Sequence, residues 1–126
     1  MATILIADDE ISIRKFLSRV VEGMGHRVLL AENGKIALNV FESESIDLSL
    51  VDVNMPDMDG IQYLEKVKEK DPDAVVIVMT GFPSAETIIE TIEDDGYTYI
   101  TKPLDISRVK DLITHGLEFR KKKVAQ

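Results

Sequence analysis

Short runs rich in β-branched residues alternate along this chain with longer stretches of helical periodicity, and this alternation restricts the fold most. Five runs are typical of strands, at 4–7, 27–31, 47–51, 75–79 and 97–101. Each is followed by a stretch with apolar residues at helical spacing, which favours an amphipathic helix. Strands that alternate with helices form a parallel sheet covered on both faces, so the pattern predicts an α/β fold with right-handed crossovers.

Several helix boundaries have residue signals of their own. Asp71 precedes a proline and so ends the third helix, whose inward face should hold Ile61, Leu64 and Val67. Ser84 is placed to cap the fourth helix, although the capping-box position carries Thr87 rather than Glu or Gln. Asp105 is placed to cap the last helix.

Length and composition exclude several classes of protein. A chain of 126 residues is of single-domain size, and with no cysteine it has neither disulfides nor thiolate metal sites. The net charge of −8 argues against direct nucleic-acid binding. We expect a cytoplasmic protein, because neither a signal peptide nor a membrane-spanning stretch is recognisable. The basic run at 120–123 divides the chain into a domain over 1–119 and a segment over 120–126, a basic C-terminal tail or the start of a linker.

Polar residues stand at the carboxyl end of four predicted strands. They are Asp8 and Asp9 after the first, Asp52 after the third, Thr80 after the fourth and Lys102 after the fifth. In an open parallel sheet, ligands bind outside these ends, where the strand order reverses. With the order 2-1-3-4-5, the reversal lies between the first and third strands, which are the two that end in carboxylates.

Three carboxylates at one edge need cations. Each pair at ~4 Å repels by roughly 4 kcal/mol at an effective dielectric of about 20. Lys102 supplies one positive charge, and hard oxygen ligands without His or Cys suit Mg²⁺. A carboxylate can also attack phosphorus, after which a metal, an ammonium and the Thr80 hydroxyl would stabilise the phosphoryl oxygens.

Four segments in this order and spacing closely resemble the receiver domains of two-component response regulators: ILIADDE, LVDVNMPDMDG, VIVMTG and YITKPL. The resemblance runs from about residue 3 to residue 117. It implies a flavodoxin-like three-layer sandwich, with a five-stranded parallel sheet in the order 2-1-3-4-5 and five helices, and it makes residues 1–119 a receiver domain.

The resemblance also implies how a metal and a phosphoryl group are held. Asp52 corresponds to the phosphoacceptor. Asp9 and Asp52 look like direct Mg²⁺ ligands, with Asp8 acting through a water and Asn54 contributing its backbone carbonyl.

Three further residues take roles from the same resemblance. Thr80 and Lys102 look like the catalytic hydroxyl and ammonium, and Tyr99 like the aromatic switch residue coupled to Thr80. The bond between Lys102 and Pro103 is expected to be cis.

The function that follows is a signalling switch, which catalyses only its own phosphorylation and slow dephosphorylation. A sensor histidine kinase or a phosphotransfer protein would phosphorylate Asp52. The surface of the fourth helix, fifth strand and fifth helix would then change to control an output domain or partner, with phosphorylation-dependent homodimerisation as an open alternative. Neither nucleic acid nor membrane is an expected partner of this domain.

Two other functions remain open at this point. A phosphohydrolase with an aspartyl-phosphate intermediate would use a similar site, but its acid–base carboxylate commonly stands two residues after the nucleophile, where this chain has Asn54. A pseudo-receiver would only scaffold. The stretch TGFPSAET resembles receivers attached to transcription activators of the nitrogen-regulation type, although a free-standing receiver is an equal alternative.

Some residues depart from the family pattern or have ordinary explanations. Asp95-Gly96 replaces the usual Gly-Ala before the fifth strand. Ser49 stands within the third strand, where its buried hydroxyl needs a partner or costs on the order of 1–3 kcal/mol. Tyr99 could be an ordinary half-buried aromatic. His26 and His115 read as structural or exposed residues.

Overall fold

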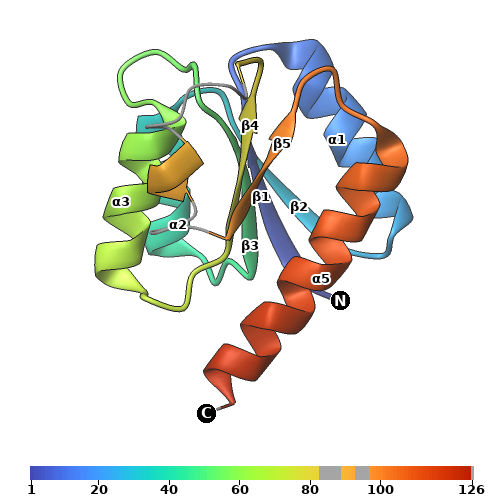
Figure 1. Ribbon diagram of the computed structural model, residues 1–126, viewed down its shortest axis with the longest axis vertical. Coiled ribbons are helices and arrows are strands. Elements are labelled where there is room, and N and C mark those ends of the chain that lie inside the picture. Colours follow the sequence, from blue (N-terminus) through green and yellow to red (C-terminus); the bar gives the residue numbers. More distant parts are fainter. Residues whose placement is uncertain (83–88, 93–96, 126) are drawn as a thin grey trace.

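Five parallel strands form a sheet in the order β2-β1-β3-β4-β5 in the computed structural model, which describes residues 1–82, 89–92 and 97–125 (Figure 1). The strands are β1 (Thr3–Ala7), β2 (Arg27–Ala31), β3 (Leu48–Asp52), β4 (Val76–Thr80) and β5 (Thr98–Thr101). The helices that lie wholly within the described residues are α1 (Ile11–Gly23), α2 (Gly34–Ser43), α3 (Gly60–Lys70) and α5 (Ile106–Val124). The predicted fold class and strand order are confirmed.

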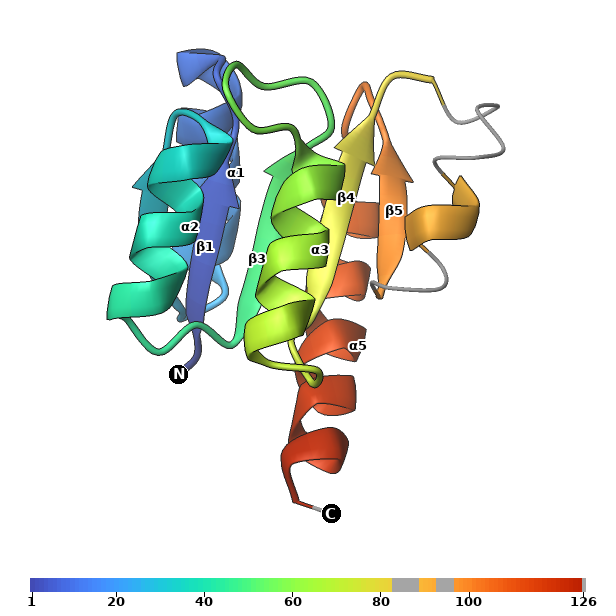
Figure 2. The same ribbon diagram turned by 90° about the vertical axis from the view of Figure 1, so that its left-hand side faces the viewer.

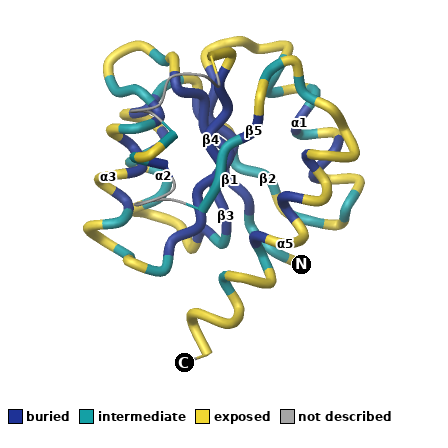
Figure 3. The backbone as a smooth tube through the Cα atoms, viewed as in Figure 1, coloured by how far each residue is buried: buried dark blue, intermediate teal, exposed yellow. Residues whose placement is uncertain are grey.

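The helices cover both faces of the sheet. Figure 2 shows α2 and α3 on one face, with α5 behind the sheet on the other. Alternate residues of β1 divide between the two layers, because successive strand side chains point to opposite faces. Ile4 and Ile6 pack in the core beside α1 and α5, while Leu5 and Ala7 pack in the core beside α2 and α3. Both cores are buried beneath helices that expose their outer faces (Figure 3).

Strands β3 and β4 each extend one residue past their predicted ends. Asp52 pairs with Met79 and Thr80 pairs with Thr101, so both polar residues keep their place in the sheet ladder. The apolar pattern alone could not show this, because backbone pairing does not depend on side-chain polarity. The shift places both side chains directly at the carboxyl edge of the sheet.

Side-chain caps fix the beginnings of α2, α3 and α5, whereas α1 begins without a side-chain cap hydrogen bond. Asp105 accepts a hydrogen bond from the Ser107 amide at 2.9 Å, as predicted for α5, and Asp71 ends α3. Asp59 and Gln62 form a full capping box at the start of α3. Residues 89–92 are helical, while the predicted cap at 84 and 87 and the Asp-Gly pair at 95–96 lie outside the described residues.

The buried hydroxyl of Ser49 has a partner. Its Oγ lies 2.8 Å from the hydroxyl of Tyr63 in α3, and Tyr63 is itself fully buried. The rings of Phe41 and Tyr63 are nearly perpendicular, with 6.4 Å between their centroids. A hydrogen bond therefore joins the central strand β3 to α3 within an otherwise apolar layer.

Helix α5 continues through the basic run and beyond the sheet, where Figure 1 shows its last turns projecting. Arg120 forms a 2.7 Å ion pair with Asp71, at the end of α3. The predicted division at residue 119 thus falls inside a continuous helix, and the assignment of 120–126 stays a prediction. Among the helices in the described part of the chain, none is both long enough and apolar enough to cross a bilayer.

Candidate functional site

Three acidic side chains meet at the carboxyl edge of the sheet. Carboxylate oxygens of Asp8, Asp9 and Asp52 lie within 4.8 Å of one another. Strands β1 and β3 bring them together, because Ala7 pairs with Val51, so that Asp8 and Asp52 come next on neighbouring strands. Asp8 and Asp52 are buried and Asp9 is exposed, so the cluster opens to solvent on the side of Asp9.

Lys102 reaches this cluster from the end of β5. Its Nζ lies 3.0 Å from Asp8 Oδ2 and 3.3 Å from Asp52 Oδ2. The Lys102–Pro103 bond is cis, as expected from the resemblance. The Lys102 amide also donates to the Thr80 carbonyl oxygen at 2.8 Å, which extends the β4–β5 ladder up to the site.

Burial and charge alter the pKa values of two of these groups. Burial raises the pKa of the Asp52 carboxyl, and the neighbouring Asp8 raises it further, while Lys102 partly opposes both effects. For Lys102, burial alone would lower the pKa. The hydrogen bond to Asp8 and the charges of Asp52 and Asp8 outweigh burial, so the pKa of Lys102 is raised. Lys102 therefore remains an ammonium, and Asp52 carries an unfavourable charge.

The donor set fits a small hard cation such as Mg²⁺. It consists of carboxylate oxygens, and three acidic groups face one ammonium. Both oxygens of Asp8 already accept hydrogen bonds, one from the Glu10 amide at 2.9 Å and one from Lys102. Because both of its oxygens accept hydrogen bonds, Asp8 fits metal binding through a water, whereas the exposed Asp9 is open to direct metal binding. The Asn54 amide donates to Asp52 Oδ1 at 3.4 Å and holds the following loop against the site.

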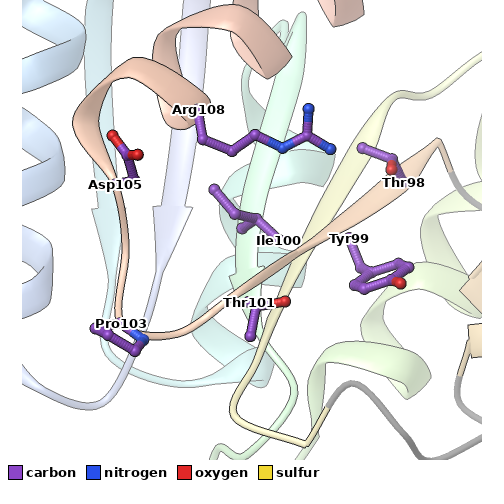
Figure 4. A pocket seen from close by; sticks show the side chains of 7 residues that line it. All are labelled: Thr98, Tyr99, Ile100, Thr101, Pro103, Asp105 and Arg108. Atoms are coloured by element: carbon purple, nitrogen blue, oxygen red, sulfur yellow. The ribbon is translucent and has the colours of Figure 1, made fainter.

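Thr80 ends β4 at the same edge of the sheet, while Tyr99 lies within β5, where it pairs with Val78. Thr80 is buried, and its Oγ1 accepts a hydrogen bond from the Phe82 amide at 3.0 Å. Tyr99 is partly buried and packs against the core beside α2 and α3. Tyr99 also lines a cavity of about 280 Å³ along β5 and the start of α5, with the neighbours that Figure 4 labels: Thr98, Ile100, Thr101, Pro103, Asp105 and Arg108.

Two contacts of the site were not predicted from the sequence. Arg14 of α1 donates to the Asp8 carbonyl oxygen at 2.6 Å and so holds the end of β1. Gly60 lies against the backbone of Asp52, where a Cβ atom would sit 2.9 Å from the Asp52 carbonyl carbon. A glycine directly after an acidic loop was the available signal for Gly60, whereas the contact of Arg14 depends on the packing of α1.

Known proteins share this fold and sequence. The family model of the response regulator receiver domain matches residues 4–114. Sporulation initiation phosphotransferase F of Bacillus subtilis is 37% identical over 117 residues, which cover 93% of this chain and 94% of that protein. A receiver domain protein from Methanospirillum hungatei superposes with a TM-score of 0.90 at 29% identity, covering 98% of each chain.

Longer proteins match as well. The transcriptional regulatory protein ZraR of Klebsiella oxytoca is 36% identical over 114 residues, which are 90% of this chain and 26% of that protein. The chain thus spans about a quarter of the length of this relative. The chain belongs to the response regulator receiver domain family, whose general function is switching by phosphorylation.

Proposed function

We propose that Asp52 accepts a phosphoryl group from a sensor histidine kinase or a phosphotransfer protein in a Mg²⁺-dependent reaction. The observation that carries this proposal is the placement of the buried Asp52 carboxylate, close to two further carboxylates and 3.3 Å from an ammonium. This constellation can hold a metal beside an oxygen nucleophile. The proposal rests on this geometry together with the family function.

In the proposed reaction, a carboxylate oxygen of Asp52 attacks the phosphorus of the donor. The new oxygen–phosphorus bond forms as the bond to the donor breaks, and the donor keeps the electron pair. Lys102 and the Thr80 hydroxyl stabilise the charge on the phosphoryl oxygens. Mg²⁺ would be held by Asp9, Asp52, the Asn54 carbonyl and, through a water, Asp8, and when bound it would neutralise further phosphoryl charge.

Phosphorylation replaces the single negative charge of the Asp52 carboxylate with an acyl phosphate that carries nearly two, and it adds phosphoryl oxygens that accept hydrogen bonds, which together can bias a two-state element. We infer that the Thr80 hydroxyl exchanges its contact with the Phe82 amide for one with the phosphoryl group, and that Tyr99 turns inward. The surface formed by the fourth helix, β5 and α5 then changes, and an output domain or partner binds it. A change from mostly inactive to mostly active needs about 5 kcal/mol of differential stabilisation.

The biological setting follows from the same proposal. Residues 1–119 act as the receiver, and 120–126 as a basic tail or the beginning of a linker. The chain works in the cytoplasm and turns over only its own phosphate, since Asn54 offers no acid–base carboxylate. The names of the relatives fit both an attached transcriptional output and a separate protein partner, and phosphorylation-dependent homodimerisation is compatible with either.

The test is labelling with a radioactive phosphodonor in the presence of Mg²⁺. We expect Asp52→Asn to abolish labelling, because the amide is not a nucleophile for phosphorus. Asp111→Asn is the matched control, since Asp111 is exposed on α5, and it should label like the wild type. Undiminished labelling of the Asp52→Asn protein would refute the assignment of Asp52.

A further inference from the structure

Two glycines from different elements lie against the loop that joins β3 to α3. Gly60 touches the backbone of Asp52 from the start of α3, and Gly34, the first residue of α2, touches Met58. The loop between them follows Asp52, the last residue of β3, and contains Asn54, whose carbonyl is a proposed metal ligand. Contacts that fix the position of this loop therefore also fix the position of the proposed ligand Asn54.

The contact at Gly34 leaves no room for a side chain. A Cβ atom there would overlap the carbonyl oxygen of Met58 and lie 2.7 Å from the Met58 Cβ. Gly34 is buried, and α2 is held at this end by the Asn33 side chain, which accepts a hydrogen bond from the Ile36 amide at 2.8 Å. Because the obstacle is backbone rather than the end of a flexible side chain, the loop itself would have to move.

The loop is tightly turned next to this contact. Asp57 has a φ of 68°, in the left-handed region that costs a residue with a side chain, and the Met58 amide donates to the Pro56 carbonyl oxygen at 2.8 Å. A hydrogen bond across one left-handed residue is a rare and strained turn. Such strain persists only where surrounding contacts enforce it, and Gly34 supplies one of these contacts from α2.

We propose that Gly34 is a positioning residue for the metal site, because its missing side chain lets α2 hold Met58 and thereby fixes the loop that presents Asn54. This inference rests on the proposed function, since it concerns the same Mg²⁺ site. Residues that orient metal ligands typically change metal affinity by roughly 10–100-fold when substituted. Gly34 would act on the metal ligands through Met58 and the loop, without touching the metal itself.

The experiment compares Gly34→Ala with Gly23→Ala by calorimetric titration with MgCl₂. Gly23 is the last residue of α1, and a Cβ atom added to it would have no neighbour within 4 Å, so alanine fits there without strain. We expect Gly34→Ala to weaken Mg²⁺ binding about tenfold and Gly23→Ala to bind like the wild type. Without metal, the amide resonances of Asn54 and Met58 should shift only in Gly34→Ala.

The outcomes separate this inference from the proposed function. Equal Mg²⁺ affinity in folded Gly34→Ala and wild type would overturn the role of Gly34 alone. A wild type that does not bind Mg²⁺ would overturn the proposed function itself. If Gly34→Ala does not fold, Met58→Gly tests the contact from the other side. It should weaken binding about tenfold while Met58→Leu retains it, and unchanged affinity in Met58→Gly would overturn the inference.

Discussion

Strand β3 carries two buried polar residues that differ in how far other side chains compensate their hydrogen-bonding groups and charge. Ser49, near its start, is 1% exposed, and its hydroxyl is paired with the Tyr63 hydroxyl. Asp52, at its end, is 5% exposed, shares the Lys102 ammonium with Asp8 and lies close to the further carboxylate of Asp9. The Ser49 pair is neutral, while the cluster around Asp52 keeps an excess of negative charge. A polar group that serves stability finds its partner within the fold, whereas one that serves binding is left under-compensated.

Burial acts on both groups and has opposite consequences. It raises the pKa of the Tyr63 hydroxyl far above its ordinary value, so the Ser49–Tyr63 pair stays neutral. It also raises the pKa of Asp52, which the proposed function nevertheless requires as a charged nucleophile. A bound cation would relieve this conflict at Asp52, and no such relief is needed at Ser49.

The largest effect should come from removing the ammonium of the acidic cluster. We expect Lys102→Met to slow phosphorylation from acetyl phosphate about 100-fold, because one fixed donor to the phosphoryl oxygens is lost. Initial rates at constant Mg²⁺ measure the effect. Lys66→Met, which changes an exposed lysine of α3, is the control, and a rate for Lys102→Met within about twofold of the control would contradict the role given to Lys102.

A smaller effect, on stability alone, should follow from breaking the neutral pair. Ser49→Ala and Tyr63→Phe each leave one buried hydroxyl without its partner, which should lower the free energy of unfolding by about 2 kcal/mol. The double variant should lose less than the sum, because it leaves no orphaned hydroxyl. Urea unfolding of all four proteins measures this coupling. Strictly additive losses would show that the hydrogen bond contributes nothing.

The smallest effect should be a gain in stability at Asp52, opposite in sign to the loss at Ser49. Folding raises the pKa of Asp52 above its ordinary value of 3.8. At a pH between 3.8 and the pKa of the folded state, the folded chain therefore binds more protons than the unfolded chain. The wild type therefore loses stability as the pH rises through that window. Asp52→Asn has no such loss and should be more stable than the wild type at pH 7.

The measurement is thermal unfolding of both proteins in chelator across the pH range. The advantage of Asp52→Asn should vanish at a pH below 3.8, where the Asp52 carboxyl is protonated in both states. An advantage that is constant with pH would instead point to an uncharged packing difference.

Much of the fold and the acidic cluster could be predicted from the sequence, because both depend on regular features. Alternating apolar patterns define strands and helices, and parallel strands end at a common edge, so Asp8, Asp52 and Lys102 had to converge if the strand order was right. Strand ends were shifted by a residue where Asp52 and Thr80 continued the ladder. The boundaries depend on backbone pairing, which side-chain patterns report only indirectly.

Contacts that depend on packing between elements could not be predicted. Ser49 was seen to need a partner, but helical periodicity assigned Ile61, Leu64 and Val67 to the inner face of α3, and the partner proved to be Tyr63. A tyrosine can bury its ring or expose its hydroxyl, so its position depends on what it meets. The fit of Gly34 against Met58 is likewise a property of two elements together.

The contact between Lys102 and Asp8 joins residues 94 positions apart in the chain. An incomplete chain that has not yet added β5 therefore lacks the cation that its acidic edge requires. Ordering such a distant pair requires closing a long loop, which is entropically costly and slow. Under the proposed function, the chemistry at this edge would therefore become available only when the last strand has joined the sheet.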